Sequence, residues 1–141
     1  MKFKDEHAEQ AALFSWADFA RGRYTELVLM FAIPNGGHRH KAVAVRMKAE
    51  GVKPGVPDIC LPVPRGPWHG LYIELKTEAG SVSREQRHWL ALLSRQGYLA
   101  EVCRGWKQAQ AVIEDYLNAA ADAGQQPPVQ HDPARGEACH G

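Results

Sequence analysis

The sequence predicts an α/β fold in which a mixed sheet of about four strands is flanked by helices. Three observations lead to this prediction. Apolar residues recur at helical spacing in several separate segments. Short apolar runs bounded by Pro and Gly, which are typical of strands, lie between those segments. The chain has 141 residues, 45% hydrophobic and 23% charged, which is the size and balance of one globular domain.

The first third of the chain predicts a helix, a buried strand and a second, short helix. Residues 5–20 are amphipathic, and Phe19 belongs to their apolar face. The run ELVLMFAI at 26–33 is almost continuously apolar and is followed by PNGG, a sequence that breaks regular structure. We therefore expect a buried central strand that ends in a turn. Residues 40–49 predict a short helix, which a glycine ends.

The middle of the chain predicts a hairpin followed by a helix. Residues 59–63 and 70–76 have the composition of strands, and the turn sequence PRGPWH lies between them. The next helix begins at Ser83, which forms the capping pattern of a helix start with Gln86 three residues later.

The last part of the chain predicts a strand, a helix and a tail. Residues 98–103 indicate a strand and residues 106–117 a helix. From residue 119 the sequence is rich in Ala, Gly, Gln and Pro and has almost no large apolar residue. We therefore expect one domain over residues 1–118 and a disordered tail over 119–141.

Cysteine usage and hydropathy exclude several classes of protein. The three cysteines are odd in number and show no CxxC spacing, so we expect neither a disulfide framework nor a zinc knuckle. The N-terminus lacks the apolar run of a signal peptide, and no run of 18 apolar residues is present. A cytoplasmic protein without a membrane anchor is the expectation.

Positive charge is concentrated in one stretch, although the net charge is only +1. Residues 21–53 contain seven Lys and Arg residues against two Glu residues. Such an excess could neutralise the phosphates of a nucleic acid. It could equally be a solvated basic face.

Two acidic residues flank the predicted hairpin symmetrically. Asp58 and Glu74 each lie eight residues from Gly66, so a regular hairpin centred there places them opposite one another. Two carboxylates this close repel each other unless a cation lies between them or one is protonated. A hard divalent cation such as Mg²⁺ is the natural partner for them.

Lys76 adds an amine to this pair. It lies two residues after Glu74, and residues i and i+2 of a strand point to the same face. The lysine could stabilise developing negative charge or, if deprotonated, act as a general base. The alternative is structural, because Glu-Leu-Lys is common on exposed strands and Asp after Pro is common in turns.

These residues resemble the signature of PD-(D/E)XK nucleases, and their surroundings resemble the stand-alone VRR-NUC family (virus-type replication-repair nuclease). The resemblance covers about residues 5–117. It is carried by the motifs Pro34-Asn35-Gly36-Gly37, GVKPGVPD at 51–58, GLYIELK at 70–76, Ser83 with Gln86, and Gly97-Tyr98.

The resemblance implies a restriction-endonuclease-like core and hydrolysis of DNA with Mg²⁺ or Mn²⁺. In the family pattern Asp58, Glu74 and the main-chain carbonyl of Leu75 hold the metal, and Lys76 is the catalytic lysine. A glutamine in the following helix is also part of the pattern, and Gln86 matches it.

The family also has an acidic residue in its first helix. Glu6 is favoured for this role because Gln10 follows it at the usual spacing, and Glu9 is the alternate. Both are also ordinary acids near a helix start, where the helix dipole favours them.

The resemblance further implies a DNA-contacting segment and a substrate class. The residues expected at the DNA are Asn35, Gly36, Gly37, His38, Arg39, Lys41 and Lys53. Stand-alone members look like homodimers of bacterial or phage origin that resolve branched DNA, such as four-way junctions. The alternatives are a sequence-specific, restriction-like endonuclease and a non-catalytic DNA-binding domain.

Overall fold

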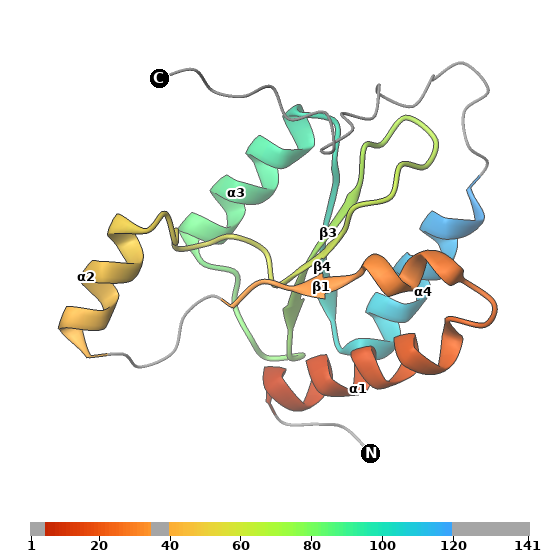
Figure 1. Ribbon diagram of the computed structural model, residues 1–141, viewed down its shortest axis with the longest axis horizontal. Coiled ribbons are helices and arrows are strands. Elements are labelled where there is room, and N and C mark those ends of the chain that lie inside the picture. The colour runs from red at the N-terminus through yellow and green to blue at the C-terminus, as the bar shows by residue number, and fades with distance from the viewer. Residues whose placement is uncertain (1–4, 35–39, 120–141) are drawn as a thin grey trace, which may run out of the picture.

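The computed structural model describes residues 5–34 and 40–119, and it shows a four-stranded sheet between helices (Figure 1). The predicted α/β fold is confirmed. The elements in chain order are α1 (Glu6–Ala20), the 3₁₀ helix η1 (Thr25–Leu29), β1 (Phe31–Ala32), α2 (Lys41–Ala49), β2 (Ile59–Leu61), β3 (Leu71–Lys76), α3 (Arg84–Arg95), β4 (Leu99–Arg104) and α4 (Trp106–Asn118). Among the described residues, no helix is both long and apolar enough to cross a membrane.

The sheet is mixed, and its strands are in the order β1-β2-β3-β4. β1 and β2 pair antiparallel, as do β2 and β3, whereas β3 and β4 pair in parallel across the connection through α3. In the β2–β3 hairpin, Ile59 is the partner of Ile73 and Leu61 that of Leu71. This register is symmetric about Gly66, as the spacing of the two acids predicted.

The expectation of a buried central strand over residues 26–33 was wrong. These residues form η1 and the two-residue edge strand β1. Tyr24, Leu27 and Met30 are buried at a spacing of three, which is one turn of a 3₁₀ helix. The apolar residues between them, and Phe31 after them, are exposed. A continuous apolar run therefore does not indicate a strand here, because only every third residue contributes to the core.

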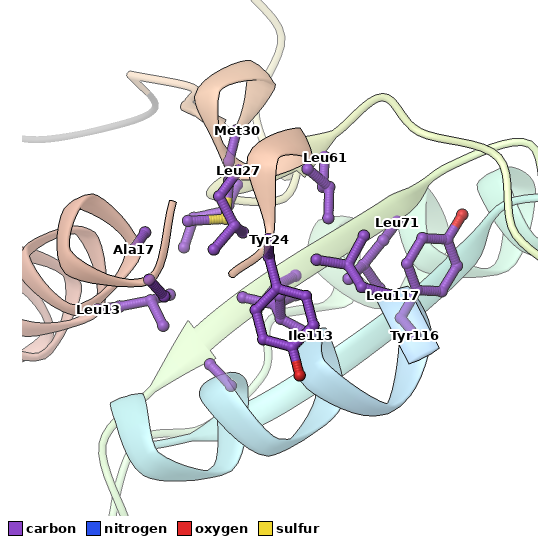
Figure 2. Close-up of a cluster of buried hydrophobic side chains, with 14 of the residues drawn as sticks. Leu13, Ala17, Tyr24, Leu27, Met30, Leu61, Leu71, Ile113, Tyr116 and Leu117 are labelled. Carbon is purple, nitrogen blue, oxygen red and sulfur yellow. The ribbon is translucent and has the colours of Figure 1, made fainter. Parts of the chain in front are cut away.

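The core lies between one face of β3 and the helices α1 and α4 (Figure 2). Leu71, Ile73 and Leu75 of β3 are each at most 1% exposed and face this layer together with Leu13 of α1 and Ile113 of α4. Phe19, which was expected on the apolar face of α1, is instead 89% exposed.

The alternation along β3 decides where polar groups can gather. Leu71, Ile73 and Leu75 point into the core, so Glu74 and Lys76 point to the opposite face of the sheet. α3 begins beside this second face, since its Gln86 reaches Glu74. The fold thereby places two charged side chains of a central strand next to the start of a helix.

Candidate active site

Asp58 lies at the entrance of β2, opposite Glu74 in the hairpin register. Its side chain is held in place, because Oδ2 accepts a hydrogen bond of 2.8 Å from the backbone N–H of Leu75. Its main-chain carbonyl accepts one of 2.7 Å from Ile33. The neighbouring strands on both sides therefore fix the position of this carboxylate.

Glu74 is 1% exposed, and its two oxygens are in different environments. Oε1 accepts a hydrogen bond of 2.9 Å from Nε2 of Gln86. Oε2 is buried and has no hydrogen-bond partner among the described residues. Burial raises the pKa of Glu74 to about 8, and the negative charge of Asp58 beside it adds to the shift.

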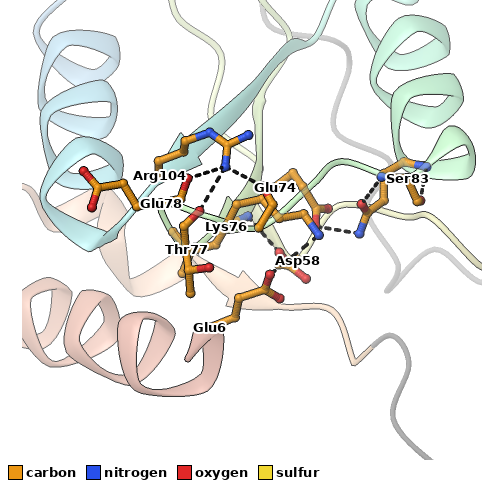
Figure 3. A network of polar contacts seen from close by, with 11 residues as sticks. Glu6, Asp58, Glu74, Lys76, Thr77, Glu78, Ser83 and Arg104 are labelled. Carbon is orange, nitrogen blue, oxygen red and sulfur yellow. Dashed lines mark hydrogen bonds and ion pairs between the residues drawn. The ribbon is translucent and has the colours of Figure 1, made fainter. Parts of the chain in front are cut away.

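Lys76 lies between two carboxylates (Figure 3). Its Nζ is 3.6 Å from Oε1 of Glu74 and 3.6 Å from Oε1 of Glu6. The lysine is 7% exposed, so it is a buried cation that depends on these two neighbours for compensation.

Glu6 and Glu9, the two alternatives for the acid of the first helix, have different neighbours. Glu6 is the acid that reaches Lys76. Glu9 instead accepts a hydrogen bond of 2.6 Å from the backbone N–H of Trp106, at the start of α4. The geometry therefore favours Glu6 for the site and gives Glu9 a structural role as a cap of α4.

Gln86 makes the capping contact that its spacing from Ser83 predicted, and it also contacts Glu74. Its Oε1 accepts a hydrogen bond from the N–H of Ser83, and its own N–H bonds to the Ser83 hydroxyl, which completes a capping box. Because the cap uses only the oxygen of the side-chain amide, Nε2 of Gln86 can donate a hydrogen bond to Glu74. The helix start thus orients an amide donor at the buried carboxylate.

The carboxylate pair fits a divalent cation such as Mg²⁺. Within the described residues, no group of three or more His, Cys, Asp and Glu side chains is arranged to hold a metal ion. Mg²⁺ needs fewer, because it is commonly held by one or two carboxylates and keeps several waters. The buried Oε2 of Glu74 has no hydrogen bond among the described residues and lies beside Asp58, so it is an oxygen atom that a cation would fit.

Sequence reasoning missed a clamp on the loop after β3. Nη1 of Arg104 bonds to the main-chain carbonyls of Thr77, Glu78 and Gly80. Gly80 is in turn so close to the Glu6–Lys76 pair that an added Cβ would lie 3.4 Å from Oε1 of Glu6. Arg104 was not predicted because it reaches this loop only through the parallel pairing of β3 with β4, in which it is the partner of Lys76.

The segment that was expected to contact DNA is only partly described. Lys41, the first residue of α2, and Lys53, in the loop after it, are exposed. The expected contacts Asn35, Gly36, Gly37, His38 and Arg39 lie outside the described residues. The main-chain carbonyl of Leu75 remains a predicted metal ligand.

A mixed α/β sheet that brings Pro57-Asp58 and Glu74-Leu75-Lys76 to one point defines the nuclease-type domains of the PD-(D/E)XK class. Comparison with known proteins agrees with this class. The model of the VRR-NUC domain family matches residues 2–107, and the chain belongs to that family. It is therefore a nuclease-type domain of DNA processing.

A solved structure described as a VRR_NUC domain protein is similar in fold. Its TM-score is 0.74 at 26% sequence identity, and the match covers 90% of this chain and 100% of that one. No curated protein matches the chain.

Proposed function

We propose that this protein is a metal-dependent endonuclease that hydrolyses phosphodiester bonds in branched DNA, such as four-way junctions. The observation that carries the proposal is the state of Glu74. Its carboxylate is buried beside Asp58, Gln86 and Lys76 bind one of its oxygens, and the other oxygen has no hydrogen bond. A fold keeps such an arrangement at a cost in stability, which indicates a functional role.

Asp58 and Glu74, with the main-chain carbonyl of Leu75, are the groups that would hold Mg²⁺ or Mn²⁺. A divalent cation supplies Lewis-acid activation of a phosphodiester and of water. Asp58 is oriented for this purpose by the N–H of Leu75, and Glu74 by the amide of Gln86.

Lys76 would stabilise negative charge that develops on the phosphate. Glu6 and Glu74 fix its ammonium group from two sides, so the charge is in place before substrate binds. We assign it this electrostatic role and not that of a general base.

Branched DNA is the proposed substrate because stand-alone members of the family look like enzymes that resolve four-way junctions, and because the described residues form one small hydrophobic core. A homodimer would place two such sites about a two-fold axis, which suits a symmetric four-way junction. Val28, Leu29 and Phe31, around the edge strand β1, expose apolar surface that a second copy could cover.

The experiment is cleavage of a labelled four-way junction beside a linear duplex of the same sequence, in Mg²⁺, Mn²⁺ or EDTA. Lys76→Ala is the test variant, and Lys107→Ala, which removes an exposed lysine of α4, is its control. We expect metal-dependent cleavage of the junction alone, which only Lys76→Ala abolishes.

The other outcomes separate the alternatives. Equal cleavage of the junction and the linear duplex would support nuclease activity and contradict the preference for branched DNA. Cleavage of particular duplex sequences would indicate a restriction-like enzyme. DNA binding by folded protein without cleavage in either metal would indicate a non-catalytic binding domain.

A further inference from the structure

The helix α3 carries a row of basic side chains on its solvent side. Arg84, His88 and Arg95 lie at positions i, i+4 and i+11, which share one face of a helix. All three are exposed. We call these residues the α3 ridge.

The two arginines of the α3 ridge differ from the other described arginines in lacking a protein partner. Within residues 5–34 and 40–119, neither Arg84 nor Arg95 has a carboxylate, carbonyl or aromatic ring in contact with its guanidinium group. The other arginines there are paired: Arg21 with Asp18, Arg23 with the ring of Tyr24, Arg46 with Glu50, Arg65 with Glu26, and Arg87 and Arg104 with main-chain carbonyls. The unpaired guanidinium groups are therefore gathered on one helix face.

The α3 ridge begins at the candidate active site. Arg84 is two residues before Gln86, whose amide holds Glu74. Ser83, the N-cap of α3, is hydrogen-bonded to Gln86 and is linked to Glu74 through it (Figure 3). From Arg84 the ridge extends about 16 Å along the helix to Arg95, at a rise of about 1.5 Å per residue. A duplex parallel to the helix would span about five base pairs over that length.

We infer that the α3 ridge binds the sugar–phosphate backbone of one duplex arm of the substrate, next to the phosphate that is cleaved. The inference rests on the proposed function and adds the surface by which DNA is held. Guanidinium groups bind phosphates through paired hydrogen bonds and remain charged at all physiological pH values. Contacts of this kind carry no base sequence information, which agrees with recognition of DNA by shape.

The test is the salt dependence of junction binding, measured by fluorescence anisotropy in EDTA. The double variant Arg84→Gln/Arg95→Gln removes two charges and keeps two good helix formers. Because each lost phosphate contact lowers the slope of log Kd against log salt by about 0.9, we expect the slope to fall by nearly two. The matched control, Arg21→Gln on α1, should leave the slope unchanged.

Cleavage kinetics and a conservative variant complete the test. We expect KM for the junction to rise about tenfold or more in the Gln double variant while kcat stays near the wild-type value. The double variant Arg84→Lys/Arg95→Lys keeps both positive charges, so its salt slope should be close to that of the wild type.

If the Gln double variant still cut junctions with an unchanged salt slope and KM, the inference that the α3 ridge binds DNA would be wrong. The proposed function would be unaffected. Wild-type protein that neither binds nor cuts DNA would overturn the proposed function and the ridge with it.

Discussion

Glu6 and Glu9 lie three residues apart on α1, yet they contact different parts of the protein. Glu6 is 3.6 Å from the ammonium group of Lys76, whereas Glu9 accepts a hydrogen bond from the N–H of Trp106 at the start of α4. One turn of α1 therefore supplies the Glu6 carboxylate to the candidate active site and the Glu9 carboxylate to the start of α4.

The first prediction separates these two acids. Glu6→Ala should lower the cleavage rate about 10- to 100-fold, the usual effect of losing a partner that orients a catalytic group. It should also lower stability, because it leaves the buried ammonium group of Lys76 with Glu74 as its one remaining carboxylate partner among the described residues. Glu9→Ala leaves the N–H of Trp106 without an acceptor and should cost about 1–3 kcal/mol of unfolding free energy in urea titrations. If Glu9→Ala cleaved as slowly as Glu6→Ala per folded molecule, the division of roles would be contradicted.

The second prediction concerns the two contacts of Gln86. Gln86→Glu keeps a capping box with Ser83 but replaces the amide donor to Glu74 by a second negative charge. We expect activity to fall at least tenfold. Ser83→Ala removes the cap and should cost about 1 kcal/mol of stability, with activity per folded molecule nearly unchanged. Both variants are measured by single-turnover cleavage and thermal melting, and the reverse pattern would show that Gln86 only caps the helix.

The hairpin and its acids could be predicted because their relationship is local. The register of β2 and β3 follows from a short turn, and alternation on a strand then places Glu74 and Lys76 on one face. The position of Asp58 opposite Glu74 can therefore be predicted from their spacing in the sequence.

The remaining contacts of the site depend on packing between distant elements. The choice between Glu6 and Glu9 depends on how α1 lies against β3 and α4, which the spacing of the two acids does not reveal. The clamp of Arg104 depends on the parallel pairing of β3 with β4. The error over residues 26–33 has a different cause, since hydrophobicity without a clear period does not distinguish a buried strand from a 3₁₀ helix.

The third prediction concerns pH and the metal-free protein. The pKa of Glu74 is raised from 4.5 to about 8, first by burial and then by Asp58. The folded protein therefore binds this proton more tightly than the unfolded chain does, and protonation favours folding. That contribution is fully present below pH 4.5 and is lost as pH rises through about 8. Melting temperatures in EDTA should show this loss, and the Glu74→Gln variant should lack it.

The fourth prediction concerns metal binding itself, without reference to cleavage. Mg²⁺ or Mn²⁺ at about 100 times its Kd should stabilise the wild-type fold by about 2.7 kcal/mol. Asp58→Asn should lose this gain, because it removes one of the two carboxylates proposed to hold the metal. In EDTA above a pH of about 8, where Glu74 is ionised, the same variant should be at least as stable as the wild type, because it removes the negative charge of Asp58 beside Glu74. An equal metal-induced rise in melting temperature in both proteins would place the cation elsewhere.

The last prediction tests the loop that Arg104 holds against Lys76. A Cβ at Gly80 would lie 3.2 Å from Oγ1 of Thr77 and 3.4 Å from Oε1 of Glu6, so Gly80→Ala should displace either the loop or the Glu6–Lys76 pair. The shift required is a few tenths of an ångström, which is less than the misplacement of about 1 Å that can cost 100-fold in rate, so we expect kcat to fall several-fold. Arg104→Met should have a similar effect, because it removes the clamp on the carbonyls of the loop.

The matched control for Gly80→Ala is Gly22→Ala, at a position where a Cβ would meet nothing within 4 Å. This variant should cut DNA at the wild-type rate. Single-turnover cleavage by the three variants, with melting temperatures taken alongside, distinguishes a local effect from loss of fold. If Gly80→Ala cleaved as fast as Gly22→Ala, the loop would have room to move without disturbing Lys76, and the clamp would serve stability alone.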